Sequence, residues 1–105
     1  INQYRLPVCI IVIDNNGGGI FNMLPIARNK KLLNPYFITP HNQNINKLSK
    51  AFGLRYKEIT SKNLLHQYIL KFFKDKKPTV LHIITDISLS TKYLEQFKKD
   101  MLRKI

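Results

Sequence analysis

The residues best suited to chemistry lie together in one short segment, Asp14 to Gly19, with the sequence DNNGGG. Asn15 offers a neutral side-chain oxygen, and the backbone carbonyl of Gly17, two residues on, can point to the same place. Oxygen donors of this kind suit Mg²⁺, which binds through few protein ligands and shares phosphate oxygens. The segment has neither the Lys-Ser/Thr of a P-loop nor the G-x-G-x-x-G spacing of a dinucleotide site. It therefore indicates a site for a metal ion with phosphate, and a plain structural turn is the alternative.

The other chemistry-bearing side chains do not form a second set. His41 has a setting typical of a loop, His66 lies near the polar side of an expected helix, and His82 lies within an expected strand. A structural role is expected for all three, because no metal-ligand spacing or acid-base pair accompanies them. Asp86 is interpreted as part of a turn. Cys9, inside a strand and without a positive neighbour, is expected to be a buried thiol in a reducing compartment.

A strand must lead into the glycine segment and helices must surround it. The apolar, β-branched run from Val8 to Ile13 predicts a strand buried on both faces. Apolar residues at helix-like spacing follow in 20–24, Pro25 ends or kinks that short helix, and 27–40 is interpreted as a long irregular connection. Ligands of open α/β sheets bind at the carboxyl ends of the strands, where this segment lies.

Helices and strands alternate along the rest of the chain. The first expected helix contains Ile45, Leu48 and Phe52, with Asn42, Asn44 or Asn46 as its N-cap and Gly53 at C′. A strand is expected over 55–59, and a helix from Thr60 or Ser61 to about Lys74. A second strand is expected over 79–85, followed by a last helix that begins at Ser88 or Ser90. Strands separated by helices predict βαβ units and a parallel sheet. The fold class is therefore α/β, with residues 1–105 forming one domain or part of one.

Composition limits the partners. The formal net charge is +12, but the lysines are scattered over the polar faces of expected helices, with no basic arm and no aromatic-basic array. We expect a solvated surface and no nucleic-acid partner; a small basic nucleic-acid-binding domain is the alternative. No signal peptide or membrane-length apolar run is present, so no membrane association is expected. The chain begins with Ile1 rather than Met, which suggests a piece of a longer protein.

A family resemblance rests on the same segment. DNNGGGIFNMLP resembles the second half of the thiamine-diphosphate binding motif, a Gly-Asp-Gly followed downstream by an Asn-Asn pair. The run Gly-Gly-x-Ile-Phe-x-x-Leu-Pro is similar to the 2-succinyl-5-enolpyruvyl-6-hydroxy-3-cyclohexene-1-carboxylate synthases of menaquinone and phylloquinone biosynthesis. Thr39-Pro40-His41 and the stretch AFGLRY at 51–56 also fit that family. The resemblance implies that residues 1–105 are the C-terminal portion of a diphosphate-binding domain.

The resemblance also implies roles for particular residues. The family's metal ligands, for Mg²⁺ or Mn²⁺, fall on the Asn15 side chain and the Gly17 carbonyl. Contacts to thiamine diphosphate are implied for Asn15, Gly17, Gly18 and Ile20, and a substrate pocket for Ile20, Phe21 and Leu24. Asp14 departs from the pattern, because the family has the first Asn of its pair there. The Gly-Asp-Gly and the cofactor-activating glutamate are absent, so no catalytic residue is expected in this chain, and alone it is expected to be inactive.

The implied reaction is the decarboxylation of 2-oxoglutarate and the addition of its succinyl unit to isochorismate. The implied partners are the remainder of a synthase chain, a second copy in a homodimer or higher oligomer, and small-molecule substrates. Apolar surface is expected where missing strands belong. Another thiamine-diphosphate decarboxylase or ligase is an alternative. The composition and the implied pathway favour the plastid of an alga, with the bacterial cytoplasm as the alternative.

Overall fold

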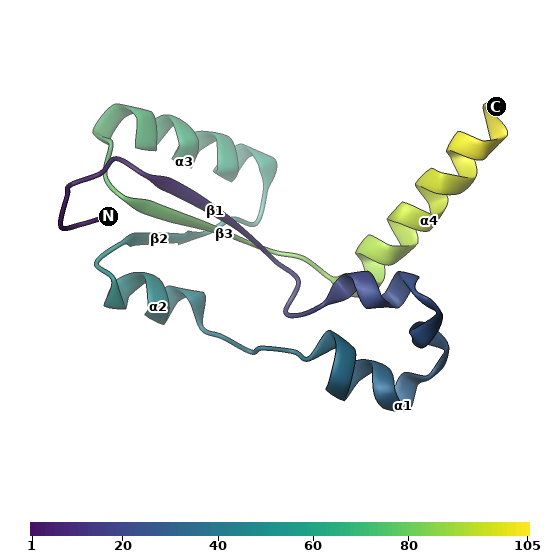
Figure 1. Ribbon diagram of the computed structural model, residues 1–105. Coiled ribbons are helices and arrows are strands. Elements are labelled where there is room, and N and C mark those ends of the chain that lie inside the picture. Colours follow the sequence, from purple (N-terminus) through teal and green to yellow (C-terminus); the bar gives the residue numbers. More distant parts are fainter. The chain divides into compact units, whose positions relative to one another are not determined.

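The computed structural model describes residues 1–105 and divides into two compact units (Figure 1). The first unit contains Ile1–Asp14 and Gln43–Ile84, and the second contains Asn15–Asn42 and Thr85–Ile105. The first holds all of the strands, and the second is built from short helical turns and one long helix. The boundary between Asp14 and Asn15 falls inside the segment that carries the predicted site.

The first unit is built on a three-stranded parallel sheet. Its strands are β1 (Cys9–Asp14), β2 (Arg55–Glu58) and β3 (Thr79–Ile84), in the order β1-β3-β2. Apolar, β-branched sequence makes β3 the central strand, and the Leu81 side chain there is 0% exposed. The prediction of an α/β fold with a parallel sheet is confirmed.

Strand β1 is less buried than predicted. Ile11 and Ile13 are 47% and 72% exposed, so the prediction of a strand buried on both faces is wrong for one face. The physical reason is that β1 is an edge strand, while the helices of this unit pack mainly on β2 and β3. Apolar side chains are therefore exposed on one face of this strand.

Two helices flank the sheet on opposite faces, α2 (Ile45–Ala51) and α3 (Lys62–Asp75) (Figure 1). Of the caps expected for α2, Asn44 is the one used: its side-chain oxygen accepts the N–H of Lys47 at 2.8 Å. Ser61 caps α3 by accepting the N–H of Leu64 at 3.2 Å. These caps satisfy N–H groups that have no partner within the helix.

An ion pair ties the end of α3 to the sheet. The Arg55 guanidinium contacts both carboxylate oxygens of Asp75, at 2.6 and 2.9 Å, and donates to Thr79 Oγ1 at 3.0 and 2.9 Å. Hydrogen bonding from Arg55 lowers the pKa of Asp75 from 3.8 to about 2. Because these residues come from β2, α3 and β3, one cluster joins three elements.

The second unit contains helical turns where an irregular connection was expected. The 3₁₀ helices η1 (Gly19–Met23) and η2 (Pro25–Arg28) precede α1 (Lys30–Leu32) and the π-helix η3 (Leu33–Ile38). Pro25 begins η2 rather than only ending η1, because a missing N–H costs nothing at a first helical position. The prediction that 27–40 is irregular is therefore wrong.

The last helix, α4 (Ile87–Arg103), begins earlier than predicted. Asp86 caps it, with Oδ1 accepting the N–H of Leu89 at 2.7 Å. Ser88 and Ser90 therefore lie inside the helix, and the interpretation of Asp86 as a plain turn residue is wrong. No helix in the chain is both long enough and apolar enough to cross a membrane.

Candidate functional site

The loop after β1 is held by its own asparagine. Asn15 Oδ1 accepts the backbone N–H of Gly17 at 3.2 Å, and the Gly17 carbonyl accepts the N–H of Gly19 at 3.0 Å. Each of the two oxygens that were predicted to bind a metal ion thus accepts one hydrogen bond within the loop. Each has a second lone pair, which remains available to another partner.

Gly17 is packed against the end of η3. A Cβ on this residue would lie 2.5 Å from the carbonyl oxygen of Ile38, closer than real Cβ atoms come. That same carbonyl accepts the N–H of Gly18 at 2.8 Å. Beside it, Asn16 and Asn42 exchange hydrogen bonds: Asn16 Nδ2 donates to Asn42 Oδ1 at 2.9 Å, and the Asn42 N–H donates to Asn16 Oδ1 at 2.8 Å. A glycine at 17 is therefore required for the loop to dock on η3.

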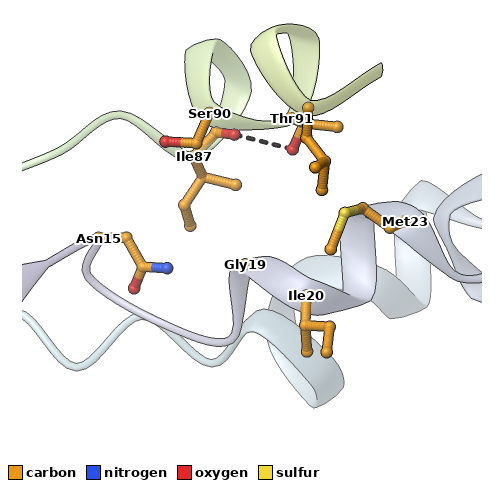
Figure 2. Close-up of a pocket in the computed structure, with 8 residues that line it drawn as sticks. Asn15, Gly19, Ile20, Met23, Ile87, Ser90 and Thr91 are labelled. Carbon is orange, nitrogen blue, oxygen red and sulfur yellow. Dashed lines mark hydrogen bonds between the residues drawn. The ribbon is translucent and has the colours of Figure 1, made fainter. Parts of the chain in front are cut away.

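Gly19 makes room for the Asn15 carboxamide. A Cβ on Gly19 would lie 2.8 Å from Asn15 Nδ2 and 3.5 Å from Ile87 Cγ1. The carboxamide therefore lies directly over a backbone that carries no side chain. In Figure 2, the Ile87 side chain extends from α4 toward the loop that carries Asn15 and Gly19.

A cavity of about 270 Å³ adjoins this carboxamide, entirely within the second unit. The loop and η1 form one wall, and the first turns of α4 form the other (Figure 2). Its lining residues are Asn15, Gly19, Ile20, Met23, Ile87, Ser90, Thr91 and Leu94. Most of this lining is apolar, with one carboxamide and two hydroxyls, and the Thr91 hydroxyl is already donated to the Ile87 carbonyl at 2.8 Å.

The predicted substrate-pocket residues separate in the structure. Ile20 lines the cavity, whereas Phe21 and Leu24 do not. Phe21 packs edge-on against Phe37, with ring centroids 5.4 Å apart, and Leu24 is 44% exposed. The reason is that successive residues of a tight helix point in different directions, so η1 turns Ile20 and Phe21 to different sides.

Sequence reasoning missed most of the cavity wall. Met23, Ile87, Ser90, Thr91 and Leu94 line it, and none of them was a predicted site residue. Met23 lies in the apolar segment 20–24 that was expected to be a short helix, and that was the available signal for it. The contact between α4 and η1 joins residues far apart in sequence, and no local pattern encodes it.

Gly18, and the other side chains that were considered for chemistry, have different surroundings. Gly18 lies against the Phe37 backbone and the Phe21 ring, so it packs on the neighbouring helical turns. His66 is exposed on α3, and His82 is buried in β3 and hydrogen-bonded on both ring nitrogens. Burial raises the pKa of the partly buried Cys9 thiol, which disfavours the thiolate. No three His, Cys, Asp or Glu side chains gather in a way that could hold a metal ion.

The donor set of the loop fits part of the coordination shell of a hard divalent cation. Asn15 Oδ1 and the Gly17 carbonyl are neutral oxygens, and no carboxylate, imidazole or thiolate lies among the residues of the adjoining cavity. Mg²⁺ is commonly held by one or two protein oxygens together with phosphate oxygens and water. Two neutral oxygens therefore fit a metal ion that arrives with a diphosphate, and do not by themselves make a complete site.

Comparison with known proteins identifies the family of the chain. Residues 1–83 match the family described as "Thiamine pyrophosphate enzyme, C-terminal TPP binding domain". The chain is 30% identical over 84 residues to a 2-succinyl-5-enolpyruvyl-6-hydroxy-3-cyclohexene-1-carboxylate synthase of Chlorobium phaeovibrioides, covering 80% of this chain and 14% of the relative. It is 49% identical over 56 residues to the synthase of the same name from Pelodictyon phaeoclathratiforme, covering 53% of this chain and 9% of the relative.

A plant protein is similar as well. The chain is 46% identical over 63 residues to "Protein PHYLLO, chloroplastic" of Arabidopsis thaliana, covering 58% of this chain and 4% of that protein. The chain thus spans a small part of the length of the relatives it matches. The resemblance expected from the glycine segment is confirmed: the chain belongs to the thiamine pyrophosphate enzymes, in the family of their C-terminal TPP-binding domain.

Proposed function

We propose that this chain is part of a thiamine-diphosphate-dependent synthase that decarboxylates 2-oxoglutarate and adds the succinyl unit to isochorismate, in menaquinone or phylloquinone biosynthesis. The observation that carries the proposal is the loop 15–19, in which the Asn15 side chain accepts the N–H of Gly17 and also lines a mostly apolar cavity. The names of the bacterial relatives support the choice of reaction.

In this proposal the residues of the loop bind and orient. Asn15 Oδ1 and the Gly17 carbonyl bind Mg²⁺, or Mn²⁺, against the diphosphate, and Gly18 lets the backbone come close. Ile20, with Met23 and the first turns of α4, gives the neighbouring cavity a mostly apolar lining. When bound, thiamine diphosphate supplies the electron sink for decarboxylation and carbon-carbon bond formation, chemistry that belongs to the cofactor.

Assembly and location are part of the same proposal. The partners are the remainder of the synthase chain, a second copy in a homodimer or higher oligomer, and small-molecule substrates; neither nucleic acid nor a membrane is a proposed partner. The chloroplastic relative supports a plastid location. The bacterial relatives support the bacterial cytoplasm as the alternative.

The test begins with the DNA upstream of the Ile1 codon, where an open frame should encode a Gly-Asp-Gly. In the complete protein, Asn15→Ala should abolish Mg²⁺-dependent retention of thiamine diphosphate, measured by equilibrium dialysis with the cofactor at fixed concentration. Asn63→Ala, which removes an exposed carboxamide on α3, is the matched control and should retain the cofactor as the wild type does. Unchanged retention in Asn15→Ala would refute the assignment of the loop.

A substrate assay then separates this reaction from those of other thiamine-diphosphate decarboxylases and ligases. The complete protein should release carbon dioxide from 2-oxoglutarate and form the coupled product only when isochorismate is present. Release of carbon dioxide from pyruvate instead of 2-oxoglutarate would agree with membership of the family but would contradict the proposed substrate.

A further inference from the structure

A side-chain hydrogen bond joins the last residue of β1 to the central strand of the sheet. Nε2 of His82 on β3 lies 2.9 Å from Oδ2 of Asp14. A carboxylate can only accept hydrogen bonds, so the imidazole N–H is the donor whether the ring is neutral or protonated. The His82 and Asp14 side chains are only 7% and 12% exposed, which shields the bond from competing water. The bond therefore fixes the end of β1 against β3.

The register of the sheet explains why these two residues meet. Val12 is the partner of His82 in the parallel ladder, and Asp14 follows Val12 by two residues on the same face of the sheet. The imidazole thus reaches diagonally toward the carboxyl end of β1. On its other side, Nδ1 of His82 lies 2.9 Å from the Tyr56 hydroxyl on β2, so the ring is held from both neighbouring strands.

A carboxylate at position 14 needs such a donor. Asp14 is the residue at which the chain departs from the family pattern described above, which has asparagine there. A nearly buried carboxylate is stable only when hydrogen bonds or an opposite charge replace the water that it has lost. His82 supplies such a hydrogen bond from the neighbouring strand. An asparagine oxygen at this position can accept the same N–H, because an amide oxygen is also an acceptor.

The fixed end of β1 is where the loop 15–19 begins. Asn15 follows Asp14 directly, so the backbone that carries the Asn15 side chain starts at a residue held by the sheet. The Asn15 oxygen is one of the two proposed metal-binding oxygens, and it accepts the Gly17 N–H at 3.2 Å. Residues that orient metal ligands without touching the ion commonly change metal affinity by about 10- to 100-fold when they are replaced.

We propose that Asp14, held by His82, is a positioning residue that fixes the start of the loop, so that the Asn15 oxygen is placed to bind the metal ion of the cofactor. This role rests on the proposed function, which gives the loop its ligand. Asp14 is not itself a proposed ligand, because its effect passes through the backbone to Asn15.

The test measures two properties of the complete protein at one pH. The first is the affinity for thiamine diphosphate at saturating Mg²⁺, by equilibrium dialysis. The second is hydrogen exchange, by mass spectrometry without the cofactor, of the loop N–H groups that are hydrogen-bonded, those of Gly17, Gly18 and Gly19. Asp14→Leu should weaken the affinity by about tenfold or more and speed this exchange by a similar factor, because it removes the acceptor for His82.

Two further variants separate positioning from a general loss of structure. Asp14→Asn should keep both properties within about threefold of the wild type, because the amide oxygen still accepts the His82 N–H. His82→Phe keeps an aromatic ring and removes the donor, so it should weaken the affinity as Asp14→Leu does. The double variant Asp14→Leu/His82→Phe should lose less than the product of the two single effects, because both substitutions remove the same bond.

Asp75→Leu is the matched control. Asp75 is also a carboxylate that binds a side chain of the sheet, but its partner is Arg55, the first residue of β2. This variant should lower the stability and leave the cofactor affinity and the loop exchange unchanged.

Wild-type affinity and loop exchange in Asp14→Leu would overturn the proposal, and so would a tenfold loss in Asp14→Asn, which would make the carboxylate charge itself the functional group. Where Asp14→Leu fails to fold, His82→Phe decides in its place, because it removes the same hydrogen bond from the other side. A wild type that retains no thiamine diphosphate contradicts the proposed function alone, since exchange in the cofactor-free protein still tests the positioning of the loop by Asp14.

Discussion

Replacing Gly17 by alanine adds one methyl group at the tightest point of the loop 15–19. The new Cβ would lie 2.5 Å from the Ile38 carbonyl oxygen, so loop and η3 must separate by nearly an ångström to reach ordinary contact. Overpacking of this kind costs about 1–3 kcal/mol. The separation also breaks the 2.8 Å hydrogen bond from the Gly18 N–H to that carbonyl, which adds about 1 kcal/mol.

The expected loss is therefore about 2–4 kcal/mol, a large part of a typical free energy of unfolding of about 5–15 kcal/mol. Because the Gly17 carbonyl moves with its residue, the same substitution should weaken retention of thiamine diphosphate. Urea denaturation and equilibrium dialysis of the complete protein measure the two effects separately.

Gly53→Ala is the matched control, because Gly53 has a φ of +67° and lies outside the loop. A Cβ there would also displace the Asn2 carboxamide, which donates to the Phe52 carbonyl. The substitution should therefore cost about 1 kcal/mol from the left-handed backbone and about 1 kcal/mol more from that lost hydrogen bond, and it should leave cofactor retention intact. If Gly17→Ala unfolds at the same urea concentration as the wild type and retains the cofactor, the loop does not dock on η3 as described.

Two further predictions concern the first unit. Leu81→Ala should lower the free energy of unfolding by about 2–5 kcal/mol in urea denaturation, because Leu81 is fully buried in the central strand; a loss below about 1 kcal/mol would contradict the assignment of the core. The Arg55–Asp75 pair should make stability depend on pH in acid. Since the pKa of Asp75 is depressed from 3.8 to about 2, the pair stabilises the fold above about pH 3.8, and that contribution is lost as pH falls through about 2. Denaturation curves of Asp75→Asn should lack this component, and a pH dependence identical to the wild type would rule the pair out as its source.

Elements with a strong local signal were predictable. The runs that became β1 and β3 are apolar and β-branched over strand length, and Ser61 and Gly53 mark the start of α3 and the end of α2 by well-defined capping chemistry. Between residues 27 and 40 the sequence has prolines and no helical period, so the short helical turns there depend on burial of Leu33 and Ile38, which no local pattern displays.

The candidate site divides in the same way. Asn15 and Gly17 stood out because a carboxamide followed by glycines is a local signature. The far wall of the cavity comes from α4, and its contact with η1 is a tertiary event between distant segments. His82 was expected to be structural, but its hydrogen bonds to Tyr56 and Asp14 arise from the strand order β1-β3-β2, which sequence alone did not supply.

The open edge of β1 bears on how this chain behaves in solution when it is produced on its own. An edge strand has backbone N–H and C=O groups free to pair with another strand, and from Cys9 to Ile13 no charged side chain blocks such pairing. Charge repulsion opposes this pairing, because a formal net charge of +12 makes copies of the chain repel one another. Salt shortens the reach of that repulsion to about 10 Å at 0.1 M. Dilute buffer should therefore keep the chain dispersed, and added salt should bring copies together along β1.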